Sequence, residues 1–482
     1  MIFQALIQNI NLNLQSKKFI MKKIISLSLI IALSTTFYGQ ENHRKCNTTR
    51  LVNQELRNNP SYLKARKNVR KITNTKSEKT TITIPVVIHI IHRTSHPNIG
   101  SGTNIPNIQI EDALRILNED FSKTNPEFPN PPRNTFLNYW GNPDLEFCLA
   151  TTDPNGNTTS GITRTATAQI NWDADDDSND PCHESNGMKK TSCGGNDGWD
   201  PFKYLNIWVC DLTNSQAGGM TLGYSYLPGL LANNPFNQNA EDDDYKDGLV
   251  VDYRYFGTVG IAAPSSDGRT PTHEIGHYLG LMHTFCEVTD AQGNPVCCDN
   301  DDNNWGGWVD DTPATKDIYF GSVTANTNNN TCNDLSYSNV FNTNVKDMDE
   351  NFMSYASNTW MFSQGQIDVM LSTLGQSEIN GGRISLKNSN VSTNCSGIIS
   401  SALNELNEEI SIYPNPSNGK LFISTSELIK SIKVTNIIGK EIYSSNNFND
   451  NSIDLINFNN GVYFINLSTE KGTITKKIIL TK

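Results

Sequence analysis

This sequence of 482 residues has few charged residues, few histidines and no long apolar run. Charged residues make up only 18% of it, and the formal net charge of −12 argues against nucleic acid or an anionic membrane as a partner. The apolar core near the N-terminus, residues 24–33, is too short for a stable transmembrane helix, so we expect no membrane span. Hydrophobic residues amount to 36%, a low share, but apolar runs recur throughout the chain and argue against disorder.

Three of the 8 histidines lie within one stretch, HEIGHYLGLMH, which runs from His273 to His283. His273 and His277 are four residues apart, so on a helix they project from nearly the same face. Gly280 tolerates a positive φ and lets the chain turn, after which His283 can reach the same point. Three imidazoles that leave a fourth position open suit a catalytic zinc ion that also binds water. A chance match is the alternative, and five specified positions make it rare.

Glu274 stands between the first two of these histidines. A carboxylate beside a zinc-bound water can take a proton from it and pass that proton to a leaving group. We therefore predict that Glu274 is the general base of a zinc-dependent hydrolase. The alternative is a solvated carboxylate on a helix, which is a weak reading for a residue between two ligands.

The pattern HExxHxxGxxH is the signature of the metzincin metalloproteases, which also carry a methionine turn downstream. The stretch NFMSYAS supplies Met353, with Tyr355 two residues later. Around these residues the chain resembles the pappalysin family, and its ulilysin-like branch in particular, over roughly 80–375. The other matching stretches are IPVVIHIIH at 84–92, FCLATTDPNGNTTSGITR at 147–164, YLNIWVC at 204–210 and DDTPA at 310–314.

The resemblance assigns roles to three residues around the zinc site. It implies that Met353 packs under the imidazoles, and that Tyr355 binds the resting zinc or hydrogen-bonds the developing oxyanion. An ordinary core tyrosine is the alternative for Tyr355. Relatives favour arginine after the scissile bond and carry an aspartate where this sequence has Asn358. An amide brings no net charge, so we predict that this protein prefers arginine less strictly than its relatives do. The substitution Asn358→Asp should then restore part of the preference for arginine.

The predicted fold class is α+β. The β-branched run at 81–93 and the apolar segments at 144–152, 204–212 and 247–255 read as strands, and Ile110 to Phe121 repeat at helical spacing. Together with the resemblance, they indicate a metzincin-like domain: a mixed twisted sheet with helices, a zinc cleft and an irregular lower subdomain. The predicted boundaries are 1–39 leader and signal peptide, 40–79 pro-segment, 80–385 protease domain, 386–407 linker and 408–482 C-terminal β-sandwich.

The N-terminal region indicates export and latency. The segment that begins MKKIIS at Met21 is typical of a secretory signal, and we expect translation to start there. The pro-segment that follows is basic and ends in serial lysine and arginine, which invites proteolysis. Its Cys46 resembles a cysteine switch, in which a thiolate occupies the open zinc position of a latent precursor. The alternative is that Cys46 forms a disulfide.

An acidic loop between Cys286 and Cys332 contains CCDNDDNNWGGWVDDTPA. Clustered carboxylates suit calcium, which takes six to eight oxygen ligands, and relatives bind structural calcium here. We expect Asp311 and Thr312 to contribute. Gly307 departs from the family pattern, and a solvated acidic loop is the alternative.

Ten cysteines suit an oxidising, extracytoplasmic setting. Cys182 and Cys193 would close a short loop. The neighbours Cys297 and Cys298 should have different partners, because a bridge between adjacent cysteines is strained.

From about residue 408, short alternating strands with turn residues between them predict a small β-sandwich. YPNPSNG at 413–419 and GVYFINL at 461–467 resemble the C-terminal sorting domain of type IX secretion cargo. The resemblance implies that the type IX machinery is a partner and that the protein is secreted or held at the cell surface. A substrate-binding immunoglobulin-like domain is the alternative.

The sequence therefore predicts a secreted zinc-dependent endopeptidase that acts on protein or peptide substrates and is made as a latent precursor. The rival hypothesis is a catalytically inactive surface binding protein that keeps the fold. Nothing among the active-site residues favours that rival.

Overall fold

The computed structural model describes residues 46–69, 81–174, 182, 185–213, 220–233, 243–263, 266–297, 309–337 and 340–391 of the N-terminal part. Of the C-terminal part it describes 411–425, 428–436, 440–446, 448, 452–468 and 473–482. The predictions about the signal peptide, the start at Met21, the basic cleavage region, Cys298 and most of the linker lie outside these residues. The domain boundaries therefore stay predictions.

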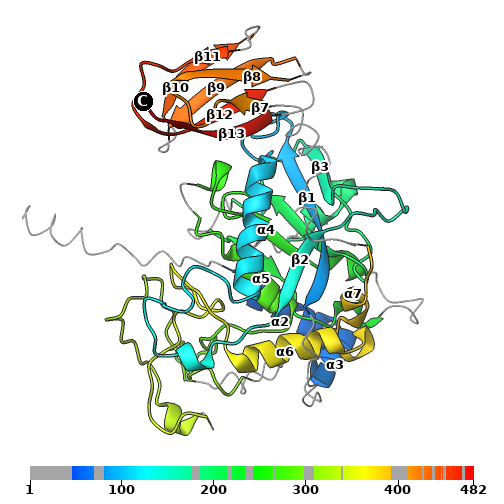
Figure 1. Cartoon of the computed structure of the whole chain (residues 1–482). Coiled ribbons are helices and arrows are strands. Elements are labelled where there is room, and N and C mark those ends of the chain that lie inside the picture. Colours follow the sequence, from blue (N-terminus) through cyan, green and yellow to red (C-terminus); the bar gives the residue numbers. More distant parts are fainter. Residues whose placement is uncertain are drawn as a thin grey trace, which may run out of the picture.

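A six-stranded sheet forms the centre of the larger body (Figure 1). Its longest strand, β1 (Ile82–Arg93), is almost wholly buried, as its continuous apolar run predicts. The order is β2-β1-β4-β6-β5, and β3 follows β2 along the same edge of β1. All pairs are parallel except β5 with β6, so β5 is an antiparallel edge strand. The other strands are β2 (Leu145–Leu149), β3 (Ile162–Thr167), β4 (Leu205–Cys210), β5 (Gly223–Ser225) and β6 (Leu249–Asp252).

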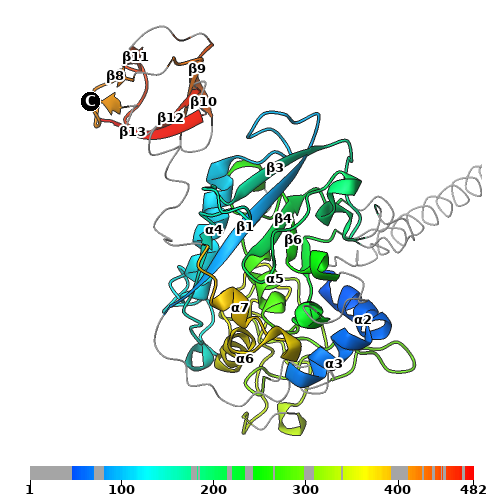
Figure 2. The same cartoon turned by 90° about the vertical axis from the view of Figure 1, so that its right-hand side faces the viewer.

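The two faces of this sheet are covered by different parts of the chain. Side chains alternate along a strand, so Val86, Ile88 and Ile90 of β1 point to one face and join the core of the helices α4 (Asn107–Phe121) and α5 (Thr270–Tyr278). Trp208 of β4 and Val250 of β6 point to the other face. That second core also contains side chains of α2 (Thr48–Asn58) and α3 (Pro60–Val69), so the pro-segment helices pack against the opposite face of the sheet (Figure 2).

The lower part of this body is irregular, as predicted. Its long helix is α6 (Gln364–Gly375), which begins with a capping box between Ser363 and Gln366, and the short α7 (Ile384–Lys387) follows. A buried ion pair between Arg133 and Glu350 holds the loops of this part together.

Short 3-10 turns occur throughout the larger body, at Leu137–Tyr139, Gly187–Lys189, Thr191–Cys193, Leu230–Asn233, Asp243–Lys246, Gly260–Ala262, Asp334–Ser336 and Glu378–Asn380.

The two disulfides whose partners are both described agree with the cysteine predictions. Cys182 pairs with Cys193 and closes the short loop. Cys297 pairs with Cys332, so it does not pair with its neighbour Cys298. Within the described ranges, no helix is both long and apolar enough to cross a bilayer.

The C-terminal strands form a separate small β-sandwich with its own core, as predicted (Figure 1). Both sheets are antiparallel, with strand orders β10-β9-β12-β13 and β11-β8-β7. Alternating apolar residues of the strands face this core, as in β12, where Tyr463, Ile465 and Leu467 are buried. The strands are β7 (Ser411–Tyr413), β8 (Lys420–Ser424), β9 (Ser431–Asn436), β10 (Glu441–Asn446), β11 (Ser452–Asp454), β12 (Gly461–Ser468) and β13 (Thr473–Leu480).

Candidate metal centre and active site

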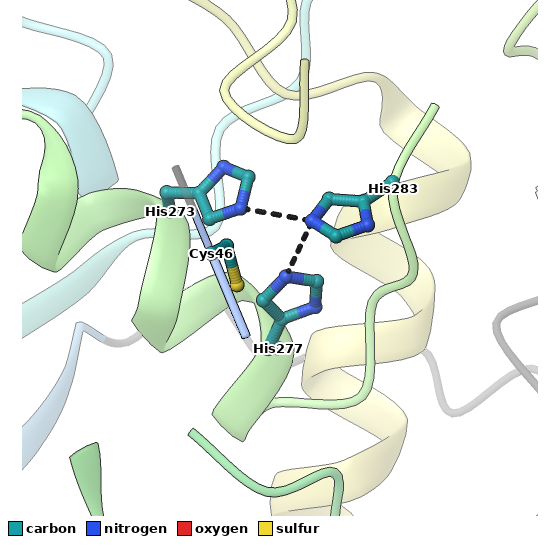
Figure 3. A group of neighbouring side chains, drawn as sticks. All are labelled: Cys46, His273, His277 and His283. Carbon is teal, nitrogen blue, oxygen red and sulfur yellow. Dashed lines mark hydrogen bonds between the residues drawn. The ribbon is translucent and has the colours of Figure 1, made fainter. Parts of the chain in front are cut away.

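Three imidazoles converge on one point beside the sheet (Figure 3). His273 and His277 lie one turn apart on α5, and His283 follows the turn at Gly280, whose φ is +106°. The Nε2 atom of His283 lies 3.2 Å from Nε2 of His273 and 3.1 Å from Nε2 of His277. All three side chains are buried. The structure thus brings the three predicted ligands together.

The other ring nitrogen of each histidine is held by an oxygen that can only accept a hydrogen bond. Nδ1 of His273 lies 2.7 Å from the carbonyl oxygen of Phe352, and Nδ1 of His277 lies 2.8 Å from that of Leu281. Nδ1 of His283 lies 3.0 Å from a carboxylate oxygen of Glu287. We infer that each Nδ1 carries the hydrogen, so each Nε2 presents a lone pair to the shared point.

This arrangement fits a zinc ion. The Nε2 atom of His283 lies 3.1–3.2 Å from the other two, a separation that suits either a shared proton or a shared metal ion. Nitrogen ligands at about 2.0–2.1 Å from a tetrahedral zinc are roughly 3.3–3.4 Å apart, close to the observed separations. Burial and the two neighbouring imidazoles keep the pKa of His277 well below its usual value, so this ring is neutral and can bind a metal.

Cys46 of the pro-segment supplies a fourth donor atom at the same point (Figure 3). Its Sγ and the three histidine donors all lie within 4.8 Å of one another. Cys46 is a buried free cysteine, so the alternative that it forms a disulfide is wrong. Burial and the nearby Glu274 raise the pKa of its thiol, and Sγ lies 3.4 Å from Oε2 of Glu274.

Glu274 is fully buried, which contradicts the alternative of a solvated helix carboxylate. Its Oε2 accepts hydrogen bonds from the Thr48 hydroxyl at 3.3 Å and from the Cys46 thiol. Its Oε1 has no hydrogen-bond partner among the described residues. Burial raises the pKa of Glu274 to about 8 in this state.

Met353 and Tyr355 both reach the site from the turn below α5. Met353 is fully buried, and Sδ lies so close to Gly276 that a Cβ there would sit 2.3 Å away, so the helix needs glycine at that position. The ring of Tyr355 packs edge-on against His283, with centroids 5.0 Å apart. Its hydroxyl donates a 3.3 Å hydrogen bond to the carbonyl oxygen of Cys46, so in this state it contacts the pro-segment.

A cavity of about 400 Å³ lies beside His273 and Glu274. Asn358, the predicted specificity residue, is not among the residues that line it, whereas its neighbours Ser357 and Thr359 are. The Asn358 amide bonds the main chain of Val323 in both directions, at 2.6 Å and 3.0 Å. An aspartate there would keep one of these bonds and place a carboxylate oxygen against a carbonyl, so Asn358→Asp would disturb this loop.

The two residues predicted for calcium have other roles in the structure. The carboxylate of Asp311 accepts from the Ser363 hydroxyl at 2.6 Å and from the main-chain N–H of Gly365 at 2.9 Å, which caps the start of α6. The hydroxyl of Thr312 donates to the carbonyl oxygen of Val309. The aspartates between Cys298 and Trp308 lie outside the described residues.

Sequence reasoning missed two residues at the site, Thr48 and Glu287. Thr48 stands two residues after Cys46, but nothing in its spacing marks a contact with a residue 226 positions away. Glu287 follows His283 by four residues, a spacing that alone does not predict a contact outside a helix. The edge strand β5 was also missed, since three residues carry no alternating pattern.

Comparisons with known proteins agree with this geometry. Residues 191–375 match the family described as pregnancy-associated plasma protein-A, and residues 411–481 match the secretion system C-terminal sorting domain. A mutant of promirolysin from Tannerella forsythia is 29% identical, with a TM-score of 0.53, over 72% of this chain and 97% of that one. Mirolysin in complex with compound 9 is 31% identical, with a TM-score of 0.49, over 64% of this chain and 97% of that one.

Curated relatives match shorter regions. An extracellular metalloprotease of Arthroderma otae is 36% identical over 133 residues, which are 27% of this chain and 37% of the relative. Another, from Arthroderma benhamiae, is 28% identical over 48% of this chain and 59% of its own length. The chain thus spans less than two thirds of these relatives. With 31% sequence identity across 97% of mirolysin and a family match over its zinc helix and methionine turn, the chain belongs to the pappalysin family of metalloproteases.

Proposed function

We propose that this protein is a secreted zinc-dependent endopeptidase, made as a latent precursor whose pro-segment occupies the active site. The observation that carries the proposal is the convergence of three histidine nitrogens on one point, with Glu274 beside them and Cys46 as the fourth donor. Membership in a metalloprotease family and the likeness to promirolysin support it. No observation favours the rival hypothesis of an inactive binding protein.

His273, His277 and His283 would hold the zinc. When bound, zinc polarises the scissile carbonyl and acidifies a bound water. Glu274 would take a proton from the bound water and pass it to the leaving amine. Its Oε1 has no hydrogen-bond partner among the described residues, and its Oε2 would lose its partners when Thr48 and Cys46 leave the cleft. Opening the cleft to water would also remove much of the burial that raises its pKa. The hydroxyl of Tyr355, once released from the carbonyl oxygen of Cys46, would donate a hydrogen bond to the substrate carbonyl.

The edge strand β5 would bind the peptide main chain. In the precursor, the main-chain N–H of Asn47 donates to the carbonyl oxygen of Gly223 at 3.3 Å, and the N–H of Ser225 donates to the Thr48 hydroxyl at 3.0 Å. An extended substrate could pair with the same two main-chain groups by adding a strand to the sheet. The pro-segment therefore covers the main-chain groups that would bind the substrate, as well as the open position at the metal.

The cavity beside His273 would take the side chain that follows the scissile bond. Most of its lining is apolar or uncharged, and its cation, Arg269, is paired with Glu127 at 2.8 Å. The carboxylate of Asp267 lines it but is exposed, so solvent screens its charge. Apart from the catalytic Glu274, the charged residues of the lining are thus paired or screened, so we expect uncharged and basic residues to be accepted comparably. Cleavage of a peptide library tests this, and a strict requirement for arginine would contradict it.

Two further proposals concern calcium and export. Calcium binding near Asp311 and Thr312 is supported by the acidic sequence of this loop, and a rise in melting temperature on adding calcium to metal-stripped protein would test it. Export by a type IX system, followed by release or surface attachment, is supported by the match of residues 411–481 to a sorting domain.

The activity is tested by digesting casein with purified, processed protein. We expect cleavage that a zinc chelator abolishes and that added zinc restores. Intact casein after incubation with zinc-loaded, processed protein would contradict the proposed function.

A further inference from the structure

The third histidine is held differently from the other two. His273 and His277 are oriented by main-chain carbonyl oxygens, which the fold itself fixes. His283 is oriented by a side chain, the carboxylate of Glu287, at 3.0 Å from Nδ1. We propose that Glu287 is the positioning residue of His283, and that Thr49 of the pro-segment binds the same carboxylate oxygen of Glu287. The inference rests on the proposed function, because it assumes that His283 binds zinc.

Packing fixes the plane of the His283 ring but does not decide whether Nε2 or a ring carbon faces the zinc point. The ring stacks on Phe285, with centroids 4.7 Å apart and planes 9° apart. Tyr355 meets it edge-on from another side. A half-turn about the Cβ–Cγ bond would keep the ring in that plane and preserve the stack, but it would put the carbon Cε1 where Nε2 lies and the carbon Cδ2 where Nδ1 lies. The bond to Glu287 distinguishes the two arrangements, because a carboxylate accepts the Nδ1 hydrogen and leaves the Nε2 lone pair for the metal.

The main chain that carries Glu287 is anchored, so this side chain can position another. The N–H of Thr284 donates to the carbonyl oxygen of Met353 at 3.2 Å. The N–H of Cys286 donates to the carbonyl oxygen of Thr315 at 2.7 Å, and Cys286 is disulfide-bonded. These bonds tie the residues between His283 and Glu287 to the turn under the zinc point and to the lower loops.

The pro-segment uses two consecutive residues to reach the two acids of the site. Thr48 donates to Glu274, and Thr49 donates to the Oε2 atom of Glu287 that also faces His283. The Thr49 hydroxyl itself lies 3.5 Å from Nδ1 of His283. In the precursor, one carboxylate oxygen therefore serves both the ligand and the pro-segment. After the pro-segment leaves, that oxygen no longer shares its lone pairs with Thr49.

The test measures zinc retention in the purified full-length precursor. Zinc content is determined by mass spectrometry, and zinc release to a coloured chelator is followed over time. We expect Glu287→Ala to release zinc about 10- to 100-fold faster than the wild type, the usual effect of losing such a partner. Glu287→Gln keeps an acceptor without the charge, so its release rate should lie between the two. Asp290→Ala, which removes an exposed carboxylate from the same loop, is the matched control and should release zinc like the wild type.

A second readout separates positioning from a general structural effect. In cobalt-substituted precursor, the visible absorption spectrum reports the ligand geometry, and we expect it to change in Glu287→Ala and to return toward the wild-type spectrum in Glu287→Gln. If the alanine variant does not fold, Glu287→Leu keeps the volume without an acceptor and carries the same expectation. Wild-type zinc release and an unchanged spectrum in the variant without an acceptor would overturn the inference. A wild-type precursor that holds no zinc would instead refute the proposed function.

Discussion

Tyr62 of the pro-segment offers a direct measure of how the precursor is kept latent. Its side chain is fully buried, its ring lies against Gly229, and its hydroxyl donates to the carbonyl oxygen of Leu227 at 3.0 Å. A Cβ at Gly229 would stand 3.2 Å from the Tyr62 ring, so glycine there leaves room for it. Tyr62 lies on α3 and not beside the zinc point, so replacing it tests the contribution of the pro-segment helices separately from that of Cys46.

Tyr62→Ala should weaken the docking of the pro-segment strongly. Removing a fully buried aromatic side chain costs about 3–5 kcal/mol. Every 1.4 kcal/mol is tenfold, so the docking equilibrium should shift by roughly 100- to 4,000-fold. Tyr62→Phe removes only the hydrogen bond, a loss of about 1 kcal/mol or roughly fivefold, and is the matched control.

The assay compares the hydrolysis of a fluorogenic peptide by the uncleaved precursor and by the processed enzyme. The processed enzyme no longer contains residue 62, so the ratio of the two rates reports docking and not catalysis. We expect this ratio to rise by the stated factor in Tyr62→Ala until it approaches one, with a gel confirming that the chain stays intact. A ratio equal to that of the wild type would refute the view that α2 and α3 contribute to latency.

Three other predictions follow from the site and the fold. Glu274→Gln should keep its zinc but lose nearly all turnover, and near wild-type cleavage by this variant would contradict its role as the base. Burial raises the pKa of Asp120 in the folded protein to about 7, whereas its pKa in the unfolded chain is near 4. The protonated side chain therefore stabilises the fold fully below pH 4, and this stabilisation is lost as the pH rises to 7. The melting temperature of Asp120→Asn should therefore fall less between pH 5 and pH 7 than that of the wild type. An equal fall in both proteins would contradict the raised pKa of Asp120. Deleting the chain from residue 408 should leave a folded, active protease that stays in the periplasm, and its normal appearance in the medium would exclude a sorting role.

Local patterns account for what the sequence predicted well. The zinc helix depends on a spacing of four and on one glycine turn, and both are local properties of HEIGHYLGLMH. The buried strand β1 and the amphipathic α4 were predicted for the same reason, since their periodicity lies within one segment. The resemblance to a known family added Met353 and Cys46, whose positions near the zinc point no local pattern could give.

Contacts between distant segments account for what the sequence did not predict. Thr48 reaches Glu274, and Thr49 reaches Glu287, across more than 220 residues of sequence in each case. The apolar residues of α2 were overlooked because basic residues dominate the composition of the pro-segment, although Leu51, Val52 and Leu56 are spaced to form one buried face. The resemblance gave Asn358 a role in specificity, and only the fold shows that its amide is bonded to the main chain of Val323.

The position of β5 explains why the two parts of the pro-segment act together. Cys46 and Asn47 lie along the outer edge of this strand, and Cys46 pairs with Gly223 as a parallel bridge. The helices α2 and α3 continue onto the face of the sheet opposite to α5. A chain that passes around an edge strand in this way cannot leave the cleft while its helices stay docked, unless the residues between them rearrange. The thiol of Cys46 therefore does not need to provide all of the inhibition, because the main-chain groups of β5 stay covered as long as α2 is held in place.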